Sequence, residues 1–355
     1  MSVDGGIRNS SASPGDSAGS GSSGSALASR RGGGAFGRAI RWLFTPLLIA
    51  SLIANFSMFG LYSAFLAPSH GPLEVFHSGN EHGTDKLAII HVKGVIMPPF
   101  SDRVIKAVKK ALEDKHVHGV LLSIDSPGGT VTDSHQIYHE LQKLAAKKPI
   151  VVSMGSLAAS GGYFIAMGAG PQSKIFAEPT TWTGSIGVII PHYEVADAAA
   201  KLGVKAAPLK TGEFKDSLSP FRELTVRDKE VWDNILNQAF DLFLEIIDEN
   251  RDTLDLPKTR ALATGQIYTA KDAKQLGMID EIGFEEDALR ELEKITGKSD
   301  AQIVSYQFPS EGLWDAVLGS ARANDPAAQW RAALELTAPR AMYYFSAGLP
   351  APRQE

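Results

Sequence analysis

A serine flanked by small residues is the first candidate for chemistry in this sequence. Ser160 lies in the run Gly155-Ser-Leu-Ala-Ala-Ser-Gly-Gly-Tyr163, between a predicted strand and a predicted apolar helix. The free N–H groups and the dipole at the start of a helix favour negative charge, so this position suits a nucleophile whose attack creates an oxyanion. The alternative is that Ser160 only caps a small-residue helix that packs tightly on a sheet.

A glycine-rich turn could supply the groups that such an oxyanion needs. The run Asp125-Ser-Pro-Gly-Gly129 directly follows a short buried strand. Its glycines can adopt backbone conformations that other residues resist, and they can approach a ligand closely. Such a turn can aim backbone N–H groups at an anion, as an oxyanion hole requires. The alternative is an ordinary turn between a strand and a helix.

A serine nucleophile also needs a base, and the sequence offers no obvious histidine. None of the nine histidines forms a recognisable His/Asp pair beside the serine. Lys215 lies in Thr211-Gly-Glu-Phe-Lys-Asp216, next to a ring and close to a glycine. A lysine can serve as a base when desolvation favours its neutral form. On spacing alone, a solvated surface lysine is the alternative.

Thiol and metal chemistry find little support. The absence of cysteine excludes a thiolate nucleophile, disulfides, iron–sulfur clusters and Cys-ligated zinc. His135 and His139 have the spacing of a zinc pair, but Gln136 occupies the position where zinc proteases carry their general-base Glu. We therefore interpret this pair as part of a polar helix face. The net charge of −5 argues weakly against nucleic-acid binding.

These segments need a scaffold that alternates strands and helices. Apolar runs and helical periodicity predict such an alternation over the middle of the chain. It indicates an α/β fold with a mostly parallel sheet and helices packed on it. The predicted strands are 87–92, 119–124 and 149–154, and the predicted helices are 101–113, 133–146 and 225–250.

The N-terminal part of the chain divides into a polar head and an apolar span. Residues 1–41 begin with a Ser/Gly-rich stretch that cannot bury enough surface to fold, so we predict a disordered head. Trp42 to Leu66 contains no charged residue, and these 25 residues would form a helix of about 37 Å, long enough to span a membrane. Arginines precede the span, and no Lys or Arg follows it until Lys86. This pattern predicts a single-pass anchor with a cytoplasmic head. The alternatives are a cleaved signal peptide, for which the apolar run is too long, and a buried core helix.

Three further segments follow the predicted anchor. We predict a Pro/Gly/Ser-rich linker over residues 67–84, a catalytic domain over 85–300 and a tail over 301–355. From Trp314 to Tyr344 the tail carries apolar residues at helical spacing, which could pack on the body, on a membrane or on a partner. The sequence does not choose among these roles.

Five motifs resemble, in order, those of the signal peptide peptidase A family of serine proteases, which is peptidase family S49 in its short single-copy form. Each motif is modest alone, but a chance match to all five in order is very unlikely. The resemblance runs from about Leu87 to Gly283, more than half of the chain. The motifs are Ser126-Pro-Gly-Gly129, Ala159-Ser-Gly-Gly-Tyr163, Thr183-Gly-Ser-Ile-Gly-Val188, Gly212-Glu-Phe-Lys-Asp216 and Gly265 to Asp280.

The resemblance implies a crotonase/Clp-protease-like α/β fold and a Ser–Lys dyad. Ser160 matches the family's nucleophile and Lys215 its general base. Gly129 and Gly161 match the oxyanion-hole donors, through their backbone N–H groups. Ser185 is the candidate for orienting the lysine. The resemblance implies no metal and no cofactor.

The family also implies substrates and an assembly. Phe214 stands where many members have Tyr, which keeps a ring beside the lysine. The expected substrates are cleaved signal peptides or other short apolar membrane peptides. We expect a ring- or dome-shaped homo-oligomer at the inner membrane, with an extracytoplasmic catalytic domain. Each site could borrow residues from a neighbouring copy, although we expect the dyad to lie within one subunit.

Two other functions stay open at this point. One is a crotonase-type acyl-CoA enzyme, because that fold also builds oxyanion holes from N–H pairs. An extracytoplasmic body would be separated from CoA, which argues against this alternative. The other is a catalytically silent scaffold that assembles membrane partners, which the presence of both Ser160 and Lys215 disfavours.

Overall fold

The structure is a computed structural model that describes residues 45–59, 71–308 and 341–345. The chain divides into two compact units, residues 1–66 and 67–355. Residues 45–59 are helical, and no helix among the described residues is long and apolar enough to cross a membrane. The predicted head, both ends of the predicted span and most of the predicted tail lie outside the described residues.

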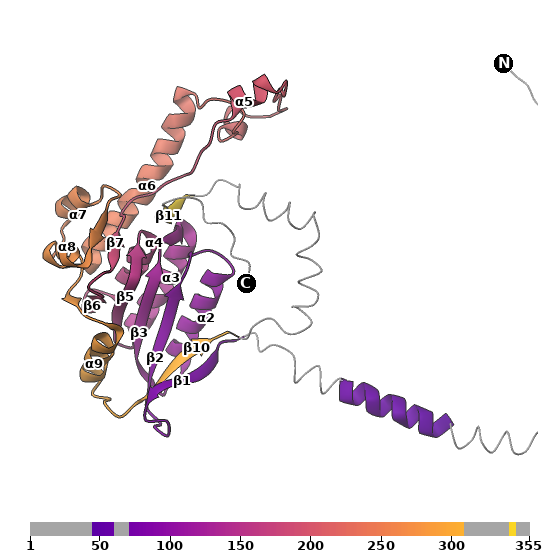
Figure 1. The fold of residues 1–355 in the computed structure, drawn as a ribbon, viewed down its shortest axis with the longest axis vertical. Coiled ribbons are helices and arrows are strands. Elements are labelled where there is room, and N and C mark those ends of the chain that lie inside the picture. The colour runs from indigo at the N-terminus through magenta and orange to yellow at the C-terminus, as the bar shows by residue number, and fades with distance from the viewer. Residues whose placement is uncertain (1–44, 60–70, 309–340, 346–355) are drawn as a thin grey trace, which may run out of the picture. The chain divides into compact units, whose positions relative to one another are not determined.

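A mostly parallel sheet organises the second unit (Figure 1). Its main path runs β1-β10-β2-β3-β5-β6-β9, and all neighbours are parallel except β1 and β10. β7 pairs in parallel with the end of β5 and antiparallel with β8, while β4 and β11 form a separate antiparallel pair. The strands are β1 (Leu73–Gly79), β2 (Lys86–Lys93), β3 (Val117–Ser126), β4 (Gly128–Thr130), β5 (Ile150–Ala159), β6 (Ile175–Ala177), β7 (Trp182–Gly184), β8 (Ile267–Thr269), β9 (Glu281–Ile282), β10 (Gln302–Gln307) and β11 (Met342–Tyr344).

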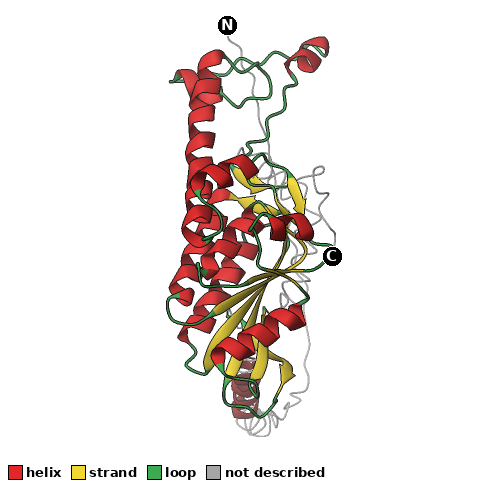
Figure 2. Cartoon of the chain, turned by 90° about the vertical axis from the view of Figure 1, so that its left-hand side faces the viewer, coloured by secondary structure: helices red, strands yellow, loops and turns green. Residues whose placement is uncertain are grey.

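Helices cover both faces of this sheet (Figure 2). Successive strand residues point to opposite faces, so Ile90 packs in the core beneath α2, α3, α4 and the end of α6, whereas Leu87 and Leu121 pack with residues of α9. The helices are α2 (Phe100–Glu113), α3 (Val131–Ala145), α4 (Gly161–Ala166), α5 (Ala196–Lys201), α6 (Val226–Asn250), α7 (Leu256–Leu262), α8 (Ala270–Gln275) and α9 (Glu285–Thr296), with 3₁₀ turns η1 (Met167–Ala169) and η2 (Glu213–Asp216).

The α/β architecture and the predicted elements of the body are confirmed. β2, α2, β3, α3, β5 and α6 all lie where the sequence predicts them, within a few residues. Thr225 begins α6 as expected: its hydroxyl accepts the Asp228 N–H at 3.1 Å, and the Asp228 carboxylate accepts the Thr225 N–H at 2.9 Å. This reciprocal pair satisfies two N–H groups that a helix start would leave free.

The sheet extends beyond the domain limits that the sequence predicts. β1 lies within the stretch 67–84 that we expected to be a linker, and β10 lies within the expected tail 301–355. β10 inserts between β1 and β2, so the two ends of the domain complete one sheet. Met342–Tyr344, at the end of the predicted apolar tail pattern, is a strand rather than helix. These pairings join residues far apart in sequence, and local periodicity carries no sign of them.

The core at the end of α6 gives a test of this packing. Phe243 is fully buried, with its ring 5.0 Å from Phe164 and 4.7 Å from Tyr343. We expect Phe243→Ala to lower the free energy of unfolding by about 3–5 kcal/mol in urea denaturation, because it leaves a cavity. Ile295→Ala, at an exposed position of α9, should cost less than about 1 kcal/mol. Equal losses for the two variants would contradict the packing.

Candidate active site

Ser160 occupies a strained turn between β5 and α4. It has φ 53° and ψ −112°, and it is one of two non-glycine residues with positive φ in the described part of the chain. Its N–H donates to the Gly184 carbonyl at 2.7 Å, and its own carbonyl accepts the Phe164 N–H at 2.8 Å. The residue is 1% exposed. Backbone strain of this kind persists only where the surroundings enforce it, and it concentrates at functional sites.

The Gly128–Gly129 turn lies directly against this serine turn. A methyl group built on Gly128 would meet the Gly161 nitrogen at 2.6 Å, and one built on Gly161 would meet the Gly128 Cα at 3.1 Å. One built on Gly129 would meet the Ile96 carbonyl oxygen at 1.9 Å. Both segments therefore need glycine. The structure brings together Gly129 and Gly161, the two glycines that the sequence offers as N–H donors to an oxyanion.

A strand from the end of the described chain lies along this turn. β11 pairs antiparallel with β4, and Tyr343 is the register partner of Gly129. On either side of this pair, the Val131 N–H donates to the Ala341 carbonyl at 3.1 Å, and the Phe345 N–H donates to the Pro127 carbonyl at 2.8 Å. Hydrogen-bonded and non-hydrogen-bonded pairs alternate along an antiparallel ladder, so the Tyr343–Gly129 pair between these two bonds is hydrogen-bonded as well. An extended peptide thus fits the edge of β4.

The carbonyl of Tyr343 faces both glycine segments. Its oxygen would lie 2.0 Å from a methyl group built on Gly128 and 3.0 Å from one built on Gly161. A carbonyl oxygen in this place is positioned between the two backbone segments that carry the candidate oxyanion donors. The arrangement can therefore hold a peptide carbonyl beside Ser160, which directly precedes Gly161.

The Tyr343 side chain fills an adjacent apolar pocket. Its ring lies 4.9 Å from the Phe164 ring and 4.7 Å from the Phe243 ring, and it is fully buried. Its hydroxyl donates to the Ala239 carbonyl at 2.6 Å. The sequence reasoning missed this strand as part of the site. The only signal is the aromatic run Met342-Tyr-Tyr-Phe345, and nothing local says where such a run docks.

Ser185 is the second strained serine, and it lies beside the first. Its φ is 49°, and its N–H donates to the Gln266 carbonyl at 2.7 Å. It directly follows Gly184, whose carbonyl holds the Ser160 N–H. Ser185 is only 7% exposed, so the two serines lie in adjoining, enclosed backbone segments.

Lys215 lies elsewhere, on an arm formed by α5, η2 and the first half of α6 (Figure 1). No residue from Tyr193 to Lys215 is buried. The Trp232 indole N–H donates to the Ser217 hydroxyl at 3.1 Å, which fixes η2 beside the start of α6. Phe243, which contacts α4, lies eleven residues further along this helix, or about 16 Å at 1.5 Å per residue. This length of α6 lies between the turn that carries Lys215 and the packing around Ser160, so it gives no support to the dyad within one subunit that we expected, and that dyad stays a prediction.

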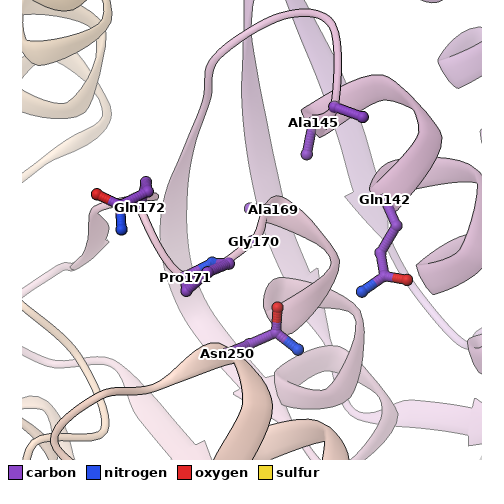
Figure 3. Close-up of a pocket in the computed structure, with 8 residues that line it drawn as sticks. Gln142, Ala145, Ala169, Gly170, Pro171, Gln172 and Asn250 are labelled. Carbon is purple, nitrogen blue, oxygen red and sulfur yellow. The ribbon is translucent and has the colours of Figure 1, made fainter.

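His135, one of the two histidines with the spacing of a zinc pair, packs against aromatic rings. His135 stacks on Tyr138 with ring centroids 6.0 Å apart, on the face of α3. In the described ranges, no group of three or more His, Asp or Glu side chains could hold a metal ion. A pocket of about 400 Å³ lies where α3, η1 and the end of α6 meet (Figure 3). Its polar side chains are the amides of Gln142, Gln172 and Asn250, which supply neither a nucleophile nor a base.

Two family models match the chain. Residues 142–298 match the model described as peptidase family S49, and residues 84–183 match the Clp protease model. The α/β fold, with its mostly parallel sheet and packed helices, is therefore Clp-protease-like. The first match contains Ser160, Ser185 and Lys215, and the second contains Gly129 and Gly161.

Three relatives match between about half and two thirds of the chain. A candidate protease from Methanocaldococcus jannaschii is 39% identical over 194 residues, which cover 55% of this chain and 61% of the relative. A candidate signal peptide peptidase from Enterococcus faecium is 36% identical over 239 residues, covering 67% of each protein. The chloroplast serine protease SPPA of Arabidopsis thaliana is 31% identical over 252 residues, covering 67% of this chain and 37% of the relative.

The glycine contacts yield a test of the site's architecture. Gly129→Ala should lower the free energy of unfolding by about 1–3 kcal/mol, because the new methyl group forces the Ile96 backbone to move. The matched variant Gly155→Ala adds a methyl group whose nearest neighbours lie at 3.6 Å, so its stability should be unchanged or slightly raised. Chemical denaturation measures both. A Gly129→Ala protein as stable as the parent would contradict the close approach.

Proposed function

Because the chain belongs to peptidase family S49, a family of serine endopeptidases, we propose that Ser160 is its nucleophile and Lys215 its general base. The observation that carries this proposal is the setting of Ser160. A buried serine stands on a positive-φ turn, next to two glycine segments that can hold a carbonyl oxygen. Such preorganised N–H donors stabilise the charge that develops when a hydroxyl attacks a peptide carbonyl.

The substrate binds as an extended strand along β4. β11 supports this mode, because it already pairs with β4 and holds the Tyr343 carbonyl against Gly128 and Gly161. Added-strand binding takes its affinity from main-chain hydrogen bonds and its selectivity from pockets for alternate side chains. The pocket between Phe164 and Phe243 accepts an aromatic or other large apolar side chain. For a peptide to bind in this way, β11 has to leave the edge of β4.

The dyad forms between two copies of the chain. Two observations support this: Lys215 is exposed on the arm, and about 16 Å of helix separates its anchor at Trp232 from the packing around Ser160. A neighbouring copy in a closed ring can present its arm to the next subunit's serine, which is a head-to-tail interface. Exposed apolar side chains along the arm fit such a contact, among them Tyr193, Leu202, Val204, Leu209 and Phe221.

The chemistry uses no group beyond these residues. Neutral Lys215 takes the hydroxyl proton as the Ser160 oxygen attacks the peptide carbonyl, and the Gly129 and Gly161 N–H groups stabilise the oxyanion. The protonated lysine then gives its proton to the leaving amine as the C–N bond breaks. Water hydrolyses the acyl-enzyme by the same route. Ser185, enclosed beside Ser160, orients the incoming lysine through its hydroxyl.

We assign the enzyme to a membrane. The uncharged run from Trp42 to Leu66 and the arginines before it support a single-pass anchor, with the head cytoplasmic and the catalytic domain across the inner membrane. A site tethered near the bilayer would meet short apolar peptides. Remnant signal peptides are such substrates, in keeping with the name of the Enterococcus faecium relative.

A subunit-mixing experiment tests this function. Full-length Ser160→Ala and Lys215→Ala should each lose peptide hydrolysis, because each lacks half of the dyad. Mixed before assembly, they should recover activity, since about one quarter of random head-to-tail interfaces pair an intact serine with an intact lysine. A mixture of Ser160→Ala with the Ser160→Ala/Lys215→Ala double variant is the control and should stay inactive.

Two outcomes would overturn parts of this account. If the mixture assembles but stays inactive, the dyad does not form between copies. If Ser160→Ala or Lys215→Ala alone retains hydrolysis, the corresponding residue is not catalytic.

A further inference from the structure

The turn that carries Lys215 is braced on both sides. Before the lysine, the Glu213 carboxylate accepts two hydrogen bonds from Arg227, at 2.9 and 2.7 Å. After it, Asp216 accepts from Lys210 at 2.7 Å, and Ser217 accepts from the Trp232 indole at 3.1 Å. Within the described residues, the Lys215 ammonium has no such partner.

Arg222 connects this turn to the start of α6. One of its nitrogens donates to Asp216 at 3.0 Å, and the guanidinium spans both oxygens of Asp228 at 2.7 and 3.2 Å. Asp228 is also half of the capping pair that begins α6. The planar Arg222 guanidinium thus links Asp216, the residue after Lys215, to the first turn of α6, which is 25 residues long.

The Arg222–Asp228 pair holds its geometry better than the exposed Arg227–Glu213 pair of the same turn. Asp228 is 1% exposed, and Arg222 is about one quarter exposed, whereas Arg227 and Glu213 are both largely in solvent. Exposed ion pairs contribute little to stability, whereas hydrogen bonds to a buried carboxylate keep a fixed geometry. The Arg222 guanidinium keeps the pKa of the Asp228 carboxyl well below its usual value. The pKa of Asp216 is also lowered, first by Lys210 and then by Arg222.

We propose that Arg222 is a positioning residue for the lysine base: by joining Asp216 to Asp228, it fixes the direction in which the arm presents Lys215. The proposal rests on the proposed role of Lys215. A base carried on an exposed arm must reach the nucleophile of another subunit within a few tenths of an ångström, and a misplacement of about 1 Å can cost about 100-fold in rate. A fixed turn supplies this orientation before the two copies meet.

Two variants and one control test the proposal in the full-length protein. Arg222→Lys retains a cation beside Asp228 but cannot span both carboxylates. Asp216→Asn leaves the buried Arg222–Asp228 pair intact and weakens only the link to the turn. Arg260→Lys, the matched control, changes the exposed Arg260–Asp241 pair at the other end of α6. We expect both test variants to lower kcat about 10–100-fold with little change in KM. The control should keep the parental kcat.

A parental kcat in both test variants would overturn the proposal, and so would a loss confined to KM. A mixed assembly of the Ser160→Ala and Lys215→Ala copies separates positioning of the lysine from a merely structural effect, because Arg222→Lys can be placed in either copy. In the Ser160→Ala copy, which supplies the lysine, it should lower the recovered activity by the same factor of about 10–100. In the Lys215→Ala copy, which supplies the serine, it should leave that activity unchanged.

Equal effects in the two placements would also overturn the proposal. If the mixture without Arg222→Lys shows no activity, the two-copy dyad fails. The kcat comparison between Arg222→Lys and Arg260→Lys then still decides the role of Arg222.

Discussion

The close approach of two glycine-containing backbone segments is the constraint on which the site depends. Gly128 and Gly161 come so near each other that a methyl group on Gly128 would collide with the Gly161 nitrogen, and one on Gly161 would lie 3.1 Å from the Gly128 Cα. This contact adjoins Ser160, whose backbone has a conformation that non-glycine residues avoid. The sheet makes the contact possible, because β3 and β5 are parallel neighbours and deliver both turns to the same edge.

The same constraint explains why the site accepts an extended strand. A backbone without side chains at Gly128 and Gly129 leaves room for another backbone, and β11 uses that room. The apolar pocket beside it is built by Phe164, one turn into α4, and by Phe243 of α6. One packing arrangement thus positions Ser160, leaves room for a peptide carbonyl and forms the pocket for a side chain.

The body and the arm divide the chemistry between them. In the proposed mechanism, the body supplies the serine and the N–H donors in an enclosed setting, and the arm carries the lysine in an exposed one. Under this proposal, activity depends on assembly, because a free copy would hold an incomplete site. The charged residues around η2 fit this division, since they fix the lysine turn to α6 without covering the lysine itself.

The sequence predicted most of the body, because those elements depend on local pattern. Apolar strands and amphipathic helices revealed β2, α3 and α6, and Thr225 was identified as the cap of α6. The pairing of β1 with β10 and of β4 with β11 joins segments that are distant in sequence, so local pattern could not reveal it. The motifs assigned Ser160, Gly129 and Gly161 to one site, and the structure brings their segments together, while their catalytic roles stay predictions. They could not show that Lys215 lies on an arm, because position in space depends on how α6 projects from the core.

The most direct measurement of the central claim is a structure of the full-length assembly in which two adjacent copies are resolved. The account predicts that the Ser160 Oγ of one copy lies about 2.6–3.2 Å from the Lys215 Nζ of its neighbour. It also predicts that the two residues of one chain stay far apart. A Ser160–Lys215 hydrogen bond within a single chain, or an assembly in which no lysine approaches any serine, would contradict it.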